Sequence, residues 1–385
     1  MFRSTVFWIH LIAGLVSGLV IAIMCFTGTV LAFEKQLVVW SERDARTVTP
    51  PAPTEPRLSL AELQARLRTA HPDARPTSLI LSSEPLAAVA FSNGRNSAFY
   101  VNPYTGEVRQ PASTAMSSFM RTMTDLHRYL GFDGKESRPR GKLVNGICNL
   151  AFFVLAVTGL YLWMPRTWSW RTLSPIIWFR QNSGAKAREF NWHNVIGLWS
   201  APVLIVLTLT AVPISFRWGG TLIYTLTGTP APAENAPGSR GGSPPTPTVP
   251  QAVTDVRSLS TDILLARVQA EFPTWRTITV RLGGAPSSFS ATVRESTSWP
   301  RTASTTIALH PTTGDTLSRT GYTDQNAAQQ VRSWTRFLHT GEALGPVGQF
   351  VAGLACLGGL FLVYTGFALS CRRFFSRRVS PLPRA

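Results

Sequence analysis

The sequence predicts a membrane α-helical bundle of four spans with two small α+β domains outside the membrane, arranged as an internal tandem duplication. Four apolar runs predict the bundle, because about 20 helical residues cross a hydrocarbon core of ~30 Å. No run contains an acidic residue, a lysine or an arginine, and the runs cover roughly residues 6–33, 144–164, 195–216 and 347–370. The first run begins after Arg3, as a signal peptide would, but it is longer than a signal-peptide core, so we expect it to be retained.

The two halves of the chain repeat one another. Two stretches align without a gap at a spacing of 183 residues: Phe7, His10, Gly14, Thr27 and Phe33 match Phe190, His193, Gly197, Thr210 and Phe216. In each outer loop a helical segment, at 60–69 or 261–271, precedes alternating strands and a Pro-x-Thr-Gly turn. This order of elements predicts one small α+β domain in each half.

Basic residues predict the orientation of the spans. The connection between the second and third spans and the tail after the fourth are rich in arginine, and short basic loops stay in the cytoplasm. Both termini are therefore predicted to be cytoplasmic, and the two long loops to lie outside. The expected segments are the first span at 1–34, an outer domain and a helix at 35–140, the second span at 141–165, a basic loop at 166–191, the third span at 192–217, an outer domain at 218–343 with a disordered linker at about 229–250, the fourth span at 344–371 and a basic tail at 372–385.

Four histidines occupy corresponding places in the two halves. His10 and His193 lie near the cytoplasmic ends of the first and third spans, and His127 and His339 precede the second and fourth spans on the outer side. An ionisable side chain inside a membrane is costly without a partner, so its default interpretation is functional. A heme iron needs one or two axial ligands and a large apolar pocket. Heme is therefore the favoured ligand, and depth predicts that His10 pairs with His193 and His127 with His339.

Neighbouring residues extend this prediction. Gly14 and Gly197 each follow a histidine by four residues, on one helix face, where a missing side chain would let a flat macrocycle approach the backbone. Close helix packing through small residues is the alternative explanation of these glycines. Flanking arginines could bind heme propionates or anchor the protein at the interface. These arginines are Arg128, Arg140, Arg332 and Arg336.

The sequence also bears on other metals and partners. Structural zinc sites prefer four convergent Cys, His or carboxylate ligands, and no carboxylate or outer cysteine accompanies these histidines. Met24 and Met123 are alternative iron ligands, whereas His71 and His310 are predicted to be surface residues without a role. The net charge of +17 arises mostly at the cytoplasmic edge, which favours membrane lipid with anionic headgroups and gives no support to nucleic-acid binding.

Two missing motifs restrict the chemistry. The chain has no Cys-x-x-Cys-His motif, so any heme would be held without a covalent link. It also has no Gly-x-Gly-x-x-Gly motif for a dinucleotide. Electrons would therefore have to come from a separate donor, either a quinone or a cytoplasmic reductase.

Together these motifs resemble the PepSY-associated transmembrane family, also called iron-regulated membrane proteins, along nearly the whole chain. The matching features are the His-x-x-x-Gly-Leu starts at His10 and His193, Leu126-His127-Arg128, the Thr-Gly-Leu-Tyr-Leu-Trp exit at Thr158–Trp163, and the Pro-x-Thr-Gly-Glu turn at Pro103–Glu107. The family often has arginine after its histidines, whereas Leu11, Asn194 and Thr340 stand there in this chain. The surroundings of His339 match the family least well.

Within the family the chain is most similar to inner-membrane ferric-siderophore reductases of the ferrioxamine-reductase type. The resemblance implies a multi-pass protein of the bacterial inner membrane with PepSY-like periplasmic domains, heme b ligated by membrane histidines, and reduction of Fe(III) in a periplasmic siderophore, hydroxamate siderophores being favoured. No acid–base catalytic residue is expected. Tyr100, Tyr104 and Arg109 are candidate siderophore contacts.

Two alternatives stay open at this point. The first is a non-catalytic membrane protein whose PepSY-like domains bind peptides or regulate a periplasmic protease. The second is a heme-bearing anchor subunit of a larger dehydrogenase.

Overall fold

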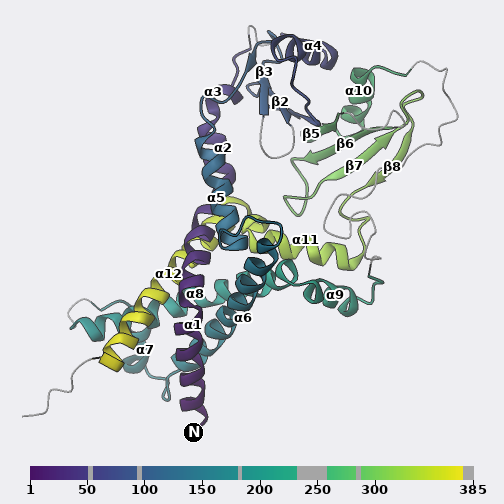
Figure 1. The fold of residues 1–385 in the computed structure, drawn as a ribbon. Coiled ribbons are helices and arrows are strands. Elements are labelled where there is room, and N and C mark those ends of the chain that lie inside the picture. Colours follow the sequence, from purple (N-terminus) through teal and green to yellow (C-terminus); the bar gives the residue numbers. More distant parts are fainter. Residues whose placement is uncertain (51–54, 93–97, 181–183, 232–257, 283–287, 376–385) are drawn as a thin grey trace, which may run out of the picture. The chain divides into compact units, whose positions relative to one another are not determined.

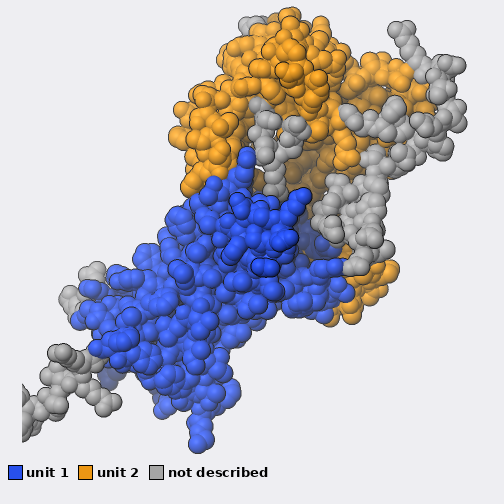
Figure 2. Space-filling view, in the orientation of Figure 1, with its two compact units in different colours: residues 1–34, 120–223, 332–385 blue, residues 35–119, 224–331 orange. Residues whose placement is uncertain are grey.

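The computed structural model describes residues 1–50, 55–92, 98–180, 184–231, 258–282 and 288–375. The chain forms two compact units, shown in Figure 2, and each unit is assembled from both halves of the sequence. Unit 1 contains residues 1–34, 120–223 and 332–385, and unit 2 contains residues 35–119 and 224–331. From residue 232 onward, the predicted linker at about 229–250 lies outside the described residues.

Unit 1 is built around four long helices that are apolar enough to cross a membrane (Figure 1). They are α1 (Phe2–Leu31), α6 (Ser137–Trp163), α8 (Ala185–Ser215) and α12 (Gly345–Phe375). Helices α1 and α8 each pack against both α6 and α12. The four helices therefore close into a ring in which α1 and α8 occupy opposite corners, and the predicted bundle of four long apolar helices is confirmed.

The long helices extend beyond the apolar runs that predicted them. Helix α6 begins at Ser137 and α8 at Ala185, whereas the apolar runs begin at residues 144 and 195. Hydropathy identifies the stretch that lipid would surround, but the main-chain hydrogen bonds of a helix continue into polar residues on either side. Hydropathy therefore located the four long helices correctly, but the residues at which they begin and end are seen only in the structure.

Polar contacts fasten neighbouring helices of the ring where the chain begins and ends. The guanidinium of Arg3 donates to the carbonyl of Leu162 at 2.6 Å, close to the end of α6. Arg372 of α12 forms a bidentate ion pair with Glu189 of α8, at 2.7 and 2.8 Å. These contacts connect α1 to the end of α6, and the beginning of α8 to the end of α12.

Shorter helices lead into and out of the bundle. Helices α5 (Ala115–Tyr129) and α11 (Ala327–His339) precede α6 and α12, and each ends at or just beyond one of the four histidines. Helix α5 buries Met120 and Met123 on one side. The other short elements are α2 (Glu34–Ser41), α3 (Arg43–Arg46), α7 (Trp170–Ile177), α9 (Arg217–Leu226) and the 3-10 helix η1 (Glu342–Leu344).

Unit 2 contains one antiparallel sheet of eight strands in the order β4-β3-β2-β1-β5-β6-β7-β8. The strands are β1 (Ser78–Ser82), β2 (Val89–Ser92), β3 (Ala98–Val101), β4 (Val108–Arg109), β5 (Trp275–Arg281), β6 (Phe289–Glu295), β7 (Thr305–Leu309) and β8 (Thr316–Thr320). Strands β1 and β5 pair from Ser78 opposite Arg281 to Ser82 opposite Thr277. The expectation of two separate α+β domains is corrected here: the two four-stranded pieces share one sheet, which removes two exposed strand edges.

Two helices cover the same face of this sheet. They are α4 (Leu60–Ala70) and α10 (Thr261–Glu271), as the apolar pattern at 60–69 and 261–271 predicts. Leu63 of α4 and Val268 of α10 join Phe91 and Ile278 of the sheet in one continuous core, and all four side chains are fully buried. The side chain of Asp262 accepts a hydrogen bond from the main chain of Leu60 at 2.6 Å, which connects the beginnings of the two helices.

The Pro-x-Thr-Gly turns have the predicted geometry. Gly106 and Gly314 have φ angles of 74° and 71°, a region that favours glycine. The side chain of Asn102 accepts hydrogen bonds within the first turn, and Nδ1 of His310 accepts the corresponding bonds from Thr312 and Thr313 in the second. His310 therefore has a structural role in a turn, which the sequence pattern alone did not assign.

The pairing of β1 with β5 can be tested by a cross-link. Ile80 and Thr279 lie opposite each other, and opposite residues of antiparallel strands have Cα atoms about 4.5–5.5 Å apart, within disulfide range. We expect the variant Ile80→Cys with Thr279→Cys to form this disulfide on mild oxidation, as shown by peptide mass spectrometry. The matched control, Ile80→Cys with Thr292→Cys, places the thiols two strands apart; equal cross-linking of both variants would contradict the register.

Candidate metal centres

Two of the predicted histidines meet inside the ring of long helices. His10 lies on α1 and His193 on α8, at opposite corners of the ring. Their ring centres are 6.4 Å apart and their ring planes are inclined by 86°. Both side chains are half-buried. This pair is called the first level below.

The other two histidines meet in the same way at the far end of α1 and α8. His127 comes from α5 and His339 is the last residue of α11. Their ring centres are 6.3 Å apart, with an angle of 49° between the planes. This pair is called the second level. The structure thus brings together the same two pairs that depth along the sequence predicts, across the two halves of the chain.

A threonine hydroxyl from a neighbouring helix lies within hydrogen-bond distance of Nδ1 of each imidazole. At the first level His10 contacts Thr158 of α6 at 2.9 Å, and His193 contacts Thr365 of α12 at 2.8 Å. At the second level His127 contacts Thr27 of α1 at 2.9 Å, and His339 lies 3.4 Å from Thr210 of α8 and 3.0 Å from the carbonyl oxygen of Leu207. Thr27 and Thr210 hold corresponding positions in the repeat, as do Thr158 and Thr365.

The direction of these hydrogen bonds follows from the threonines. Each hydroxyl donates its own hydrogen to the carbonyl four residues earlier, at 2.6 Å for Thr27 and Thr158, 2.7 Å for Thr210 and 2.9 Å for Thr365. The hydroxyl oxygen can then only accept, so Nδ1 must carry the proton. This tautomer leaves the lone pair on Nε2, which is the atom that binds a metal when the other nitrogen is hydrogen-bonded.

The second-level rings are neutral as well as oriented. Burial lowers the pKa of His127 to about 4 and also lowers the pKa of His339 below its ordinary value. An unprotonated imidazole is the form that a metal ligand needs.

A glycine follows three of the four threonines and gives the ring its space. A methyl group at Gly159 would lie 3.3 Å from Cε1 of His10, one at Gly366 3.7 Å from Cε1 of His193, and one at Gly28 3.4 Å from Cε1 of His127. The fourth position is Ala211. Sequence reasoning used these threonines only as marks of the repeat and of the family pattern and did not place them beside the histidines, although the Thr-Gly pair recurs at Thr27, Thr158 and Thr365.

The spacing of the rings fits two axial ligands on one metal. An imidazole nitrogen binds a first-row metal at about 2.0–2.1 Å and lies about 1.1 Å from its own ring centre, so two such ligands place their ring centres about 6.3 Å apart. The separations of 6.4 and 6.3 Å agree with this value. Two imidazoles in an apolar bundle suit heme, whereas structural zinc takes four donors. Within the described ranges no three His, Cys, Asp or Glu side chains cluster.

The other residues that the sequence predicts around the histidines have different surroundings. Gly14 and Gly197 face Leu155 and Leu362 of neighbouring helices, and a methyl group at either glycine would lie 3.7 Å from the leucine that it faces. This placement fits close helix packing, and their contact with a macrocycle stays a prediction. The arginines predicted to bind propionates, Arg128, Arg140 and Arg336, are exposed, and Arg332 is half-buried. Met24 and Met123 are buried on α1 and α5.

The candidate siderophore contacts of unit 2 have different surroundings. Tyr100 is only 2% exposed, and its hydroxyl donates to Glu42 at 2.7 Å. Its burial raises its pKa and removes it from any docking face, so that prediction is wrong for Tyr100. Tyr104 is half-exposed, and Arg109 pairs with Glu107 at 2.6 Å, which holds the pKa of that carboxyl below its ordinary value.

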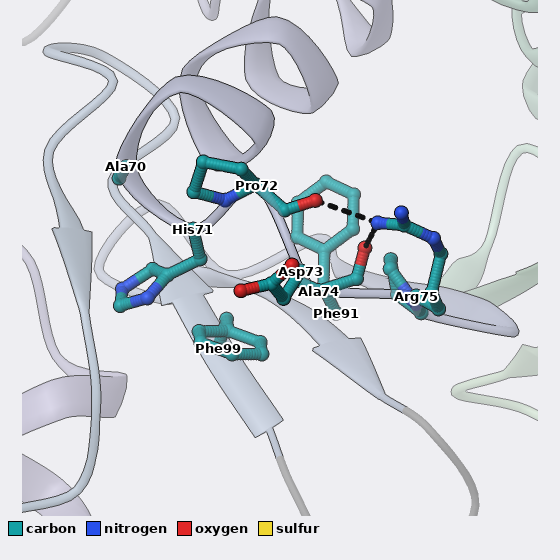
Figure 3. A pocket seen from close by; sticks show the side chains of 9 residues that line it. Ala70, His71, Pro72, Asp73, Ala74, Arg75, Phe91 and Phe99 are labelled. Carbon is teal, nitrogen blue, oxygen red and sulfur yellow. Dashed lines mark hydrogen bonds between the residues drawn. The ribbon is translucent and has the colours of Figure 1, made fainter.

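Unit 2 also has a hollow of about 380 Å³ after helix α4 (Figure 3). His71 packs there against Phe99, with ring centres 4.7 Å apart, and Arg75 donates to the carbonyls of Pro72 and Ala74. The guanidinium therefore donates to main-chain carbonyls of its own loop. None of the predicted ligands of a metal or siderophore lines this hollow.

Comparison with known proteins covers both units. No curated protein matches the sequence. The family model of the PepSY-associated TM region matches residues 7–373, a range that includes all four paired histidines, the eight-stranded sheet and the four long helices apart from the first residues of α1 and the last two of α12. The chain therefore belongs to the PepSY-associated transmembrane family.

Proposed function

We propose that the protein is a heme-dependent oxidoreductase of the bacterial inner membrane that passes electrons to Fe(III) in a periplasmic siderophore. The observation that supports this proposal is the pairing of four imidazoles, each anchored at Nδ1, at the spacing of two ligands on one metal. When bound, heme b would supply a reversible one-electron couple at each level.

The depth of the two levels suits transfer across a membrane. Thr27 lies 17 residues after His10 on α1, and Thr210 lies 17 residues after His193 on α8. At 1.5 Å per residue, each interval spans about 25 Å of helix. The levels would therefore lie near the two sides of a hydrocarbon core of about 30 Å. The chain's own task is to hold and orient the rings at both depths, and this requires no acid–base residue.

The substrate and the donor are proposed by chemical class. Each siderophore-bound Fe(III) would accept one electron, and the Fe(II) formed binds hard hydroxamate oxygens more weakly, so iron is released. A membrane quinol or a cytoplasmic reductase would supply the electron. The PepSY-like unit 2 would offer the docking face, for which Tyr104 and Arg109 remain candidates. The family resemblance favours this substrate class.

Heme ligation can be tested by single substitutions. We expect His10→Ala or His193→Ala to remove the first-level heme, and His127→Ala or His339→Ala the second, so that each variant retains roughly half of the wild-type heme. Heme per protein and reduced-minus-oxidised spectra provide the measurement. His71→Ala is the matched control, because His71 packs on Phe99 in unit 2. Full heme with unchanged bands in all four variants would show the ligand assignment to be wrong.

The reductase activity can be tested with the purified protein under anaerobic conditions. We expect dithionite-reduced protein to be reoxidised by a ferric hydroxamate siderophore, with one Fe(II) trapped by a ferrous chelator for each heme oxidised. The same siderophore loaded with Ga(III) is the control, since Ga(III) has the same charge but accepts no electron. A red protein that stays reduced would favour an anchor subunit of a larger dehydrogenase. A colourless folded protein would favour a non-catalytic protein that binds peptides or regulates a protease.

A further inference from the structure

The four histidine anchors are not equivalent. At the first level, the threonine hydroxyl is the partner that the structure gives to Nδ1 of His10 and of His193, at 2.9 and 2.8 Å. At the second level, Nδ1 of His339 lies closer to the main-chain carbonyl of Leu207, at 3.0 Å, than to the hydroxyl of Thr210, at 3.4 Å. Nδ1 of His127 lies 2.9 Å from the hydroxyl of Thr27, and this ring also has a main-chain partner at Met24. Both second-level rings thus have a main-chain partner, whereas the two first-level rings are anchored by threonine hydroxyls.

The residue after the threonine also differs between His339 and the two first-level histidines. Gly159 and Gly366 follow the two first-level threonines, and a methyl group at either would approach Cε1 of the anchored ring within 3.3 or 3.7 Å. Ala211 follows Thr210 and has such a methyl group, which is buried.

The partner of Nδ1 determines how strongly Nε2 donates to a metal. An acceptor on Nδ1–H raises the basicity of the ligand, and the loss of such a partner typically costs 10- to 100-fold in metal affinity. A more basic ligand favours Fe(III) over Fe(II), so it lowers the reduction potential. Removal of the acceptor should therefore shift the potential upward.

We propose that Thr158 and Thr365 are positioning residues that set the reduction potential of the first-level centre, whereas Thr210 is dispensable because the carbonyl of Leu207 holds His339. This inference rests on the heme assignment proposed above and adds to it which residues tune which site. A side-chain anchor can be altered by a single substitution, but a main-chain anchor persists when Thr210 changes.

Matched threonine-to-valine substitutions test the proposal, because valine keeps the shape of threonine and removes the hydroxyl. Thr365 and Thr210 both lie on long helices of the bundle, and each donates to the carbonyl four residues earlier. The variants Thr365→Val, Thr158→Val and Thr210→Val are compared with the wild type by optical redox titration, low-spin electron paramagnetic resonance and heme content. His10→Ala identifies which of the two titrating bands belongs to the first level.

We expect Thr365→Val and Thr158→Val to raise the potential of the first-level band by about tenfold in the Fe(III)/Fe(II) equilibrium, which is about 59 mV for one electron. Thr210→Val should change neither reduction potential by more than about a third of that shift, relative to the wild type. Thr365→Ser keeps a hydroxyl and should restore the wild-type value. Loss of first-level heme in Thr365→Val, with recovery in Thr365→Ser, would support the same role.

Two results would overturn the inference. One is an equal shift in Thr365→Val and Thr210→Val, and the other is unchanged potentials in Thr365→Val and Thr158→Val with both hemes bound. Either result would leave the proposed function intact, because wild-type heme and siderophore reduction are measured separately. Wild-type protein without heme would instead contradict the proposed function itself.

Discussion

The hydrogen bond between a histidine Nδ1 and a threonine of another helix is the interaction on which the organisation of unit 1 depends. A polar ring inside an apolar bundle is expensive unless its donor has a partner. The threonine satisfies that donor, and because its own hydrogen is already used within its helix, it also fixes the tautomer of the ring. This hydrogen bond thereby fixes the orientation and the protonated nitrogen of the imidazole and the rotation of the helix that carries the threonine. It recurs around the bundle.

These contacts also explain why neither half of the chain forms a level alone. Each level takes one histidine from each half, so His10 faces His193 and His127 faces His339. Unit 2 also needs both halves of the chain, because β1 from the first half and β5 from the second half pair through main-chain hydrogen bonds and form one sheet. Both units therefore require the two halves together, and the sites would not exist in an isolated half.

Small residues determine how closely the rings can approach their partners. The glycines after Thr158, Thr365 and Thr27 lie beside the Cε1 atom of the anchored ring, and Ala211 holds the corresponding position after Thr210. The ring of His339 lies 3.0 Å from the carbonyl oxygen of Leu207, nearer than to the hydroxyl of Thr210. The surroundings of His339 also departed most from the family pattern in the sequence, so a local sequence difference and a geometric difference coincide at the same residue.

The sequence by itself determined the four spans, the equivalent depths of His10 with His193 and of His127 with His339, and the helices and turns of the outer repeats. Local sequence patterns predict these features, since hydropathy, helical periodicity and turn chemistry depend on residues that are close in the chain. Only the tertiary structure decided that one sheet joins the two outer pieces, that Tyr100 is buried, and that Thr27, Thr158, Thr210 and Thr365 lie beside the histidines. Those facts depend on how helices rotate and strands pair across more than a hundred residues, and no local pattern in the sequence specifies that.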